Sequence, residues 1–167
     1  RSEGRHLGGS TVNATEAVVV QTIVEAFLAC GMDASSVGVI CPFRAQQRLI
    51  AELPAMITWR STGLEVSTID KYQGRDKPVI LLSFVRSNIS GEVGRLLQDF
   101  RRLNVAVTRA KCKLILIGSF STLQKGSAVL KPVLSRLQSD GRVIRLPQMC
   151  GLTDSVLDLE RAPNCKD

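Results

Sequence analysis

Two short and almost wholly apolar runs, each followed by a polar segment, constrain the fold of this chain more than any other feature. The runs are VGVIC at residues 37–41 and VILLSFV at residues 79–85. A strand that is apolar along its whole length is buried on both faces, which is typical of parallel sheets covered by helices. The sequence therefore predicts an α/β fold of three layers, in which helices cover both faces of a parallel sheet.

Strand and helix signals alternate along the rest of the chain. Apolar residues recur at helical spacing over residues 13–30, where Asn13 and Glu16 form a capping-box pattern and Gly31 ends the helix. The remaining elements follow from the same kind of pattern. Further helices are predicted over residues 43–53, 98–111 and 127–139, and further strands over residues 65–69, 114–117 and 143–146.

The length of 167 residues fits one domain with a core of ordinary size. We expect the folded domain to span residues 13–148, between a linker or loose segment at 1–12 and a tail at 149–167. The chain begins at Arg1 instead of a methionine, which indicates a segment of a longer protein. No apolar run approaches the roughly 18 residues of a membrane span, so we expect no membrane partner.

Charge and composition narrow the function. The 22 Lys and Arg residues exceed the 15 Asp and Glu residues, and the net charge of +7 favours an anionic partner such as nucleic acid or a nucleotide. Five cysteines without a CxxC pair, and a single histidine, predict that this chain holds no zinc site. The chain also lacks a GxxxxGK[ST] phosphate loop, so alone it is not a complete nucleotide hydrolase.

The segment RRLNVAVTRAK at residues 101–111 is the first candidate for chemistry. On the predicted helix, Arg102 and Arg109 are seven residues apart and share a face. Guanidinium groups are costly to bury without anionic partners. Two interpretations remain open: a solvated basic helix, or a phosphate clamp in which Arg109 stabilises charge that develops on a transferring phosphoryl group.

The segment STIDKYQGRDK at residues 67–77 is the second candidate. A strand ends at Thr68, and the chain then turns towards Gln73 and Gly74, with Lys71 adding positive charge. Hydroxyl groups and a backbone amide exposed by glycine suit contacts with phosphate. The alternative is an ordinary polar loop in which Gly74 is a turn residue.

The third candidate is CPFRAQQ at residues 41–47, where Phe43 and Arg44 directly follow a strand. Arg44 is suited to a phosphate, whereas Phe43 either stacks on a base or packs under the next helix. In open parallel sheets, ligands bind beyond the carboxyl ends of the strands. We therefore expect the functional residues at that edge, where the segment SFVRSN at residues 83–88 also lies.

These segments resemble motifs IV, V and VI of superfamily 1 helicases, in the branch that includes the helicase of nonsense-mediated decay. The motif YQGRDK followed by RRLNVAVTRAK is similar to the corresponding motifs of eukaryotic nuclease-helicases, which trim Okazaki-fragment flaps and resect broken DNA ends. The likeness runs from about Asn13 to about Leu146. It implies a RecA-like second motor domain of an ATP-dependent DNA helicase, which lacks a phosphate loop of its own and is inactive alone.

The resemblance implies a role for each matching residue on the nucleotide side. Arg109 is expected to act as the arginine finger on the γ-phosphate, and Arg44 as a second phosphate-side arginine. Other residues are expected near the nucleotide, or between it and the nucleic-acid strand: Gln73, Gly74, Asp76 and Arg102. Relatives carry an arginine where this chain has Ala14, so we expect Arg44 to replace that contact.

On the nucleic-acid side, the resemblance implies contacts from Thr68, Lys71 and Phe43. The implied cofactors are ATP and Mg²⁺, shared with a first RecA-like domain outside this chain. An iron–sulfur cluster is implied only for a region upstream. The implied partners are single-stranded DNA, that first domain and a single-strand-binding protein, and the implied location is the nucleus, with the mitochondrion as a second compartment.

Two alternatives remain open on the residues alone. Motifs IV to VI do not separate DNA from RNA, so an RNA helicase of the same branch fits them too. A RecA-like module that binds nucleic acid without catalysis is the alternative from another class. The arginines of RRLNVAVTRAK argue against that module, because Arg109 has little purpose there without a phosphate.

Overall fold

The computed structural model describes residues 6–7, 10–72 and 75–146. Its main sheet has four parallel strands in the order β4-β3-β5-β6. A small antiparallel pair, β1 and β2, precedes them. The strands are β1 (His6–Leu7), β2 (Ser10–Thr11), β3 (Val37–Cys41), β4 (Glu65–Thr68), β5 (Lys77–Ser83) and β6 (Ala110–Ile117).

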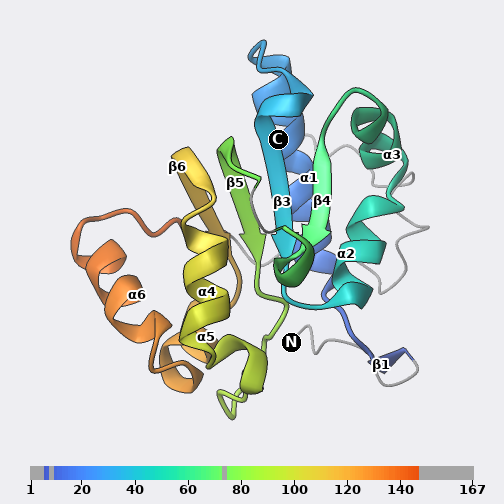
Figure 1. Cartoon of the computed structure of the whole chain (residues 1–167). Coiled ribbons are helices and arrows are strands. Elements are labelled where there is room, and N and C mark those ends of the chain that lie inside the picture. Colours follow the sequence, from blue (N-terminus) through green and yellow to red (C-terminus); the bar gives the residue numbers. More distant parts are fainter. Residues whose placement is uncertain (1–5, 8–9, 73–74, 147–167) are drawn as a thin grey trace, which may run out of the picture.

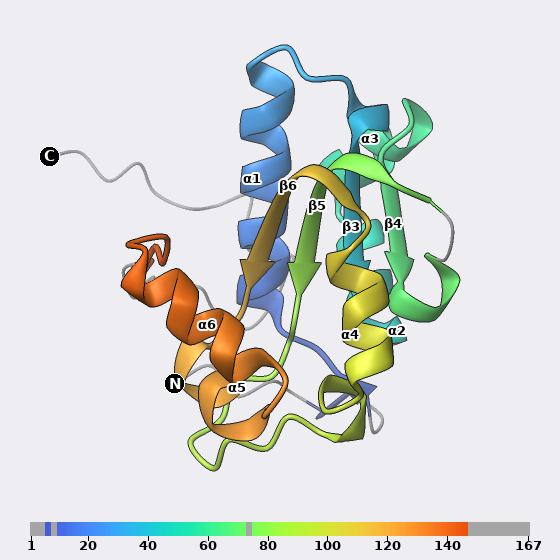
Figure 2. The same cartoon turned by 60° about the vertical axis from the view of Figure 1, so that its left-hand side comes forward.

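Helices cover the sheet on both faces, as Figures 1 and 2 show. One face carries α1 (Ala14–Ala29), α2 (Arg44–Ala51) and α3 (Pro54–Ser61). The other carries α4 (Phe100–Val107), α5 (Phe120–Gly126) and α6 (Leu130–Ser139). Three single-turn helices lie in the connections: η1 (Ala34–Ser36), η2 (Ile69–Lys71) and η3 (Arg95–Leu97). The predicted three-layer α/β architecture is confirmed.

Alternate residues of each central strand enter two separate cores, because successive side chains of a strand point to opposite faces. On β3, Val39 and Cys41 pack with α1, α2 and α3, whereas Ile40 packs on the side of α4. On β5, Leu81 and Leu82 divide in the same way. Burial on both faces explains why these strands are apolar throughout.

The element boundaries correct several predictions. The helix predicted over 98–111 ends at Val107, and Ala110 already begins β6. The predicted strand over 143–146 is wrong, since those residues form neither strand nor helix. Helices α3 and α5 lie in segments for which no element was predicted, and β5 ends at Ser83 instead of Val85. The other predicted elements agree with the structure to within a few residues.

Tyr72 packs against Gly38 of the sheet, where a larger residue than glycine would clash with its side chain. Its side chain is fully buried, and a Cβ on Gly38 of β3 would lie 2.0 Å from the Tyr72 hydroxyl oxygen. That hydroxyl has no hydrogen-bond partner among the described residues. Burial raises the pKa of Tyr72, so the phenol stays neutral at any physiological pH. The hydroxyl is therefore a buried polar group that its surroundings leave unpaired.

We expect Tyr72→Phe to raise the free energy of unfolding by about 1 kcal/mol, because it removes an unpaired buried hydroxyl and keeps the ring. Urea denaturation of both chains measures the difference. We expect Gly38→Ala to lower the free energy of unfolding by about 1–3 kcal/mol, and by less in the Tyr72→Phe background. A loss of stability in Tyr72→Phe would mean that the hydroxyl has a bound partner.

Candidate functional site

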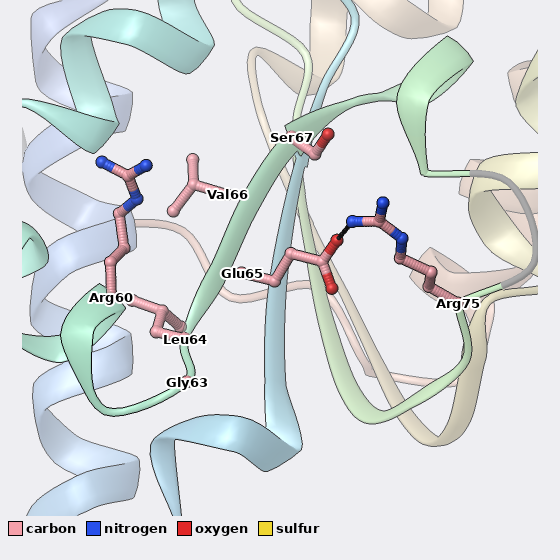
Figure 3. A pocket seen from close by; sticks show the side chains of 7 residues that line it. All are labelled: Arg60, Gly63, Leu64, Glu65, Val66, Ser67 and Arg75. Atoms are coloured by element: carbon pink, nitrogen blue, oxygen red, sulfur yellow. Dashed lines mark hydrogen bonds and ion pairs between the residues drawn. The ribbon is translucent and has the colours of Figure 1, made fainter.

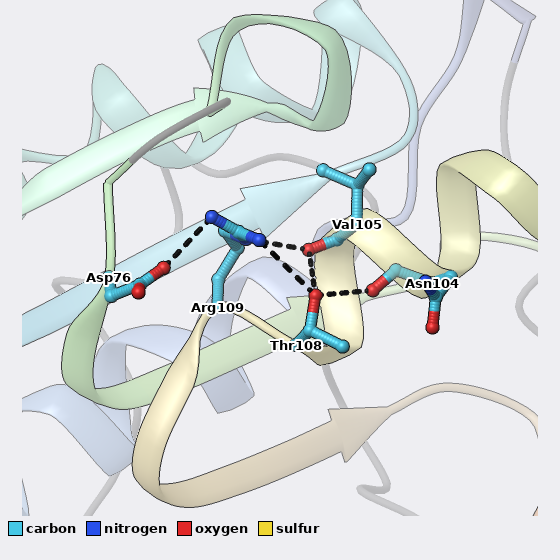
Figure 4. A network of polar contacts seen from close by, with 5 residues as sticks. All are labelled: Asp76, Asn104, Val105, Thr108 and Arg109. Carbon is cyan, nitrogen blue, oxygen red and sulfur yellow. Dashed lines mark hydrogen bonds and ion pairs between the residues drawn. The ribbon is translucent and has the colours of Figure 1, made fainter.

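Arg109 lies just beyond the end of α4, in the turn that leads into β6. Its Nη1 forms an ion pair of 2.9 Å with Asp76 Oδ1, and its Nε donates to the Val105 carbonyl oxygen over 3.0 Å. Nη2 is 3.4 Å from Oγ1 of Thr108, which itself donates to the Asn104 carbonyl oxygen (Figure 4). The guanidinium group is thus held by α4 and by the loop before β5.

The Arg109–Asp76 ion pair is only partly buried. The Arg109 side chain is 23% exposed and that of Asp76 is 45% exposed. The backbone oxygen of Arg109 also accepts from the Lys77 N–H, which anchors the turn to the start of β5. A half-buried guanidinium that is already oriented is suited to bind phosphate oxygens through two N–H groups at once.

The prediction that Arg102 and Arg109 share one helix face is wrong. The helix ends at Val107, so only Arg102 lies on α4. Its Nε is 3.5 Å from Asp70 Oδ1 of η2 and 3.6 Å from Asp99 Oδ2, the N-cap residue of the helix. Arg102 therefore ties the start of α4 to the end of β4, whereas Arg109 lies at the opposite end of the helix.

Phe43, Arg44 and Arg86 lie at the carboxyl edge of the sheet, after β3 and β5. Arg44 is exposed at the first position of α2. The Arg86 guanidinium carbon lies over the Phe43 ring, 5.4 Å from its centroid, a distance suited to a cation–π contact. Phe43 therefore already carries a cationic side chain on one face of its ring.

Arg44 and Arg109 lie at opposite ends of the strands. Arg44 follows the carboxyl end of β3, whereas Arg109 precedes β6 and pairs beside the amino end of β5. The seven residues of β5 span about 20 Å, so one phosphate does not contact both arginines in this structure. Arg109 and Asp76 therefore lie away from the carboxyl edge, where the functional residues were expected.

The remaining predicted residues lie in the connection from β4 to β5. Thr68 ends β4 and is 6% exposed, so little of it is accessible to a strand. Lys71 is exposed in η2. The expected contacts of Gln73 and Gly74 lie outside the described residues.

A buried polar network at the start of α1 was missed by the sequence analysis, which assigned Glu16 only to a capping box. Glu16 Oε2 accepts from the Ser83 hydroxyl over 2.7 Å and from the Val85 N–H over 2.8 Å. Its Oε1 accepts from Asn13 Nδ2 over 3.2 Å. Gln46, fully buried, exchanges hydrogen bonds with the Asn13 backbone over 2.7 and 3.0 Å. The only feature of the sequence that pointed to Gln46 was its position shortly after the strand predicted at residues 37–41.

Burial governs the protonation of this network. It raises the pKa of Glu16 to about 7, although the donors from Ser83, Val85 and Phe84 act in the opposite direction. Burial also raises the pKa of the neighbouring Cys41 thiol, and Glu16 adds to that effect. Glu16 therefore titrates near neutral pH, far above the usual range of a carboxyl group.

A shallow cavity of about 350 Å³ lies beside the outer strand β4, and none of the predicted site residues lines it (Figure 3). Arg75 lines it and pairs with Glu65, and Arg60 donates to the Ala51 carbonyl oxygen from α3. Both arginines thus already have acceptors within the fold. Among residues 6–7, 10–72 and 75–146, no group of three or more His, Cys, Asp or Glu side chains is arranged to hold a metal ion. No helix in that part of the chain is long and apolar enough to cross a membrane.

A protein-family model described as an AAA domain matches residues 1–121, which include Arg109, Asp76 and the network at the start of α1. This chain belongs to the AAA domain family. The family and the parallel sheet between two helical layers together confirm the predicted RecA-like fold.

Named relatives place this AAA domain more narrowly. It is 47% identical over 140 residues to the human DNA replication ATP-dependent helicase/nuclease DNA2. These 140 residues are 83% of the chain and 13% of the human protein. The Schizosaccharomyces pombe relative of the same name is 45% identical over 117 residues, which are 70% of the chain and 8% of that protein.

The Arabidopsis thaliana relative, DNA replication ATP-dependent helicase/nuclease JHS1, is 40% identical over 137 residues, which are 80% of the chain and 10% of that protein. The AAA domain thus spans about one tenth of the length of each of these three relatives. Its resemblance to the nuclease-helicases is thus confirmed.

Proposed function

We propose that this domain is the second motor domain of an ATP-dependent DNA helicase, and that Arg109 is its arginine finger. The oriented and partly exposed guanidinium group of Arg109 carries the proposal. Three groups hold it: the Val105 carbonyl, the Thr108 hydroxyl and the Asp76 carboxylate. Orientation before the ligand arrives removes much of the entropy cost of binding a developing charge.

The Asp76 carboxylate compensates the positive charge of Arg109 until a phosphate takes the place of that carboxylate. A γ-phosphate bound to the first domain repels the Asp76 carboxylate and attracts Arg109, so the pair opens as the two domains close. The Nε bond to the Val105 carbonyl remains, and it keeps the fork directed outwards. Loss of the γ-phosphate restores the Asp76 pair, and the domains part. ATP then shifts a two-state equilibrium through a contact that exists only in the closed state.

The carboxyl edge of the sheet is the proposed surface for the nucleic-acid strand. It carries Arg44 and Lys71, both exposed, and Phe43 beside them. We assign Arg44 to this strand and not to the γ-phosphate, because it lies at the far end of β3 from the Arg109 pair. If the two motor domains bind the strand in turn as ATP binds and is hydrolysed, the strand advances through the protein.

The cofactors and partners of the proposal follow from the assignment of the nucleotide to the Arg109 end of the sheet and of the strand to its carboxyl edge. ATP and Mg²⁺ bind at the boundary with a first RecA-like domain, which supplies the phosphate loop and the acidic metal ligand. Arg109 and Asp76 are the residues of this chain that face the nucleotide. Single-stranded DNA, with a single-strand-binding protein, is the proposed partner, and the nucleus is the proposed location because the named relatives act in DNA replication.

ATP turnover by the longer protein that carries this domain tests the proposal. We expect turnover to rise on adding single-stranded DNA, and to rise less on adding RNA of the same length and sequence. Equal stimulation by both would favour an RNA helicase of the same branch. Saturable strand binding without any response to ATP would instead favour a module that binds without catalysis, and would remove the proposal.

A further inference from the structure

The backbone at Val85 adopts a conformation that a β-branched residue rarely takes. Val85 is the one non-glycine residue among the described residues with positive φ, at 74°. The Arg86 N–H donates to the Phe84 carbonyl oxygen over 2.8 Å, so Val85 is the central residue of a strained three-residue turn. Such a conformation persists only where its surroundings enforce it.

The start of α1 enforces this turn. The Val85 N–H donates to Glu16, and the Val85 carbonyl oxygen accepts from Asn13 Nδ2 over 3.2 Å. Both backbone groups of the strained residue are therefore bound by buried side chains. The turn ends β5 at Ser83 and directs the next residue, Arg86, towards β3. Without it, the apolar run at 79–85 would continue as a strand.

At the carboxyl edge of the sheet, the guanidinium group of Arg86 forms no hydrogen bond with any described residue. Its guanidinium group lies over the Phe43 ring, and its buried Nε has no hydrogen-bond partner among the described residues. No carboxylate of that part of the chain lies within ion-pair distance of it. Other arginines of the described residues do have an oxygen acceptor within the fold: Arg60, Arg75, Arg102, Arg109 and, on α6, Arg136.

We propose that Arg86 is a phosphate-binding residue for the nucleic-acid strand, with Phe43 as its platform and Glu16 as its positioning residue. The inference rests on the proposed function, and it adds a contact that the motif resemblance did not assign. The two terminal Nη groups of Arg86, which form no hydrogen bond among the described residues and are not among its fully buried atoms, would bind the phosphodiester oxygens, whereas the buried Nε is out of reach of a strand. The Phe43 ring fixes the plane of the guanidinium fork. Arg44, exposed and one residue after Phe43, adds positive charge to the same edge.

Strand binding by the longer protein that carries this domain, followed with a fluorescent oligothymidylate over a range of salt concentrations, tests the contact. We expect Arg86→Gln to weaken binding about tenfold and to reduce the slope of log Kd against log salt by about 0.7, as for one lost phosphate contact. We expect Arg86→Lys to keep the slope, because it keeps the charge, but to recover only part of the affinity, because an ammonium group lacks the planar fork.

The matched control is Arg136→Gln on α6, which removes an exposed arginine that pairs with Asp140. We expect this variant to bind like the unchanged chain. Equal binding by Arg86→Gln and Arg136→Gln would overturn the inference and leave the proposed function intact. Failure of the unchanged longer protein to bind the strand at any salt concentration would overturn both.

A second pair of variants separates positioning by Glu16 from a purely structural role. Glu16→Gln keeps an oxygen that can accept from the Val85 N–H, whereas Glu16→Ala does not. We expect Glu16→Gln to retain the slope of log Kd against log salt. We expect Glu16→Ala to reduce that slope by about 0.7, as Arg86→Gln does. Circular dichroism should show that both variants are still folded. A folded Glu16→Ala chain that keeps the full slope would overturn the positioning role.

Discussion

Replacing Arg109 with Ala is expected to lower strand-stimulated ATP turnover about 10³-fold or more in the longer protein that carries this domain. That is the usual cost of removing an arginine finger from a phosphoryl-transfer enzyme. Strand binding should stay largely intact, because Arg109 lies at the opposite end of the strands from the carboxyl edge. Steady-state turnover and strand anisotropy, measured on the same preparations, check both expectations.

Asp76→Asn is the informative companion to this variant. It removes the charge that pairs with Arg109 and leaves the bond from Nε to the Val105 carbonyl in place. If Asp76 only neutralises the finger between cycles, turnover should fall far less than in Arg109→Ala. Normal turnover by Arg109→Ala would contradict the assignment of the finger, and Arg136→Ala controls for the simple loss of one positive charge.

The second large effect is expected in the pH dependence of stability. Glu16 has a pKa of about 7 in the folded chain, against an ordinary value near 4.5. The folded state therefore binds the extra proton between these two values, and the unfolded state does not. The free energy of unfolding should fall as pH rises through this window, by up to about 3 kcal/mol, and change little from this group beyond it.

Urea denaturation between pH 5 and 8 measures this effect, with Glu16→Gln as the chain that lacks the titration. We expect the difference in unfolding free energy between the unchanged chain and Glu16→Gln to move in favour of Glu16→Gln as pH rises. The control is Glu25→Gln, an exposed position on the same helix, where the difference should stay flat. A flat difference for Glu16→Gln as well would mean that Glu16 is ionised throughout this range.

Much of the fold could be predicted from local pattern. The apolar run at 37–41 forms β3 with the predicted bounds, and Asn13 caps α1, as its capping-box pattern indicates. These features depend on neighbouring residues, so a single sequence contains the information for them. The segment RRLNVAVTRAK also made Arg109 a candidate for binding phosphate, which stays a prediction, and the predicted helix around it extended too far.

The errors occur where distant contacts override local pattern. Ala110 and Lys111 have a helical rhythm with the residues before them, yet β6 begins at Ala110, because Lys77 of β5 pairs with it. That pairing places Arg109 in a turn beside Asp76 instead of on a helix face with Arg102. No local periodicity contains the register between two strands.

The sequence alone thus determined the α/β class, the buried strands and the residue types available for binding phosphate. Only the tertiary structure decided how these residues are grouped: Arg109 with Asp76 at one end of the sheet, and Arg86 on Phe43 at the other. The physical reason is clearest at Val85, which belongs to the almost wholly apolar run at residues 79–85. It leaves the strand because its N–H is taken by Glu16, 69 residues earlier in the chain, and a hydrogen bond over that separation exists only once the core has formed.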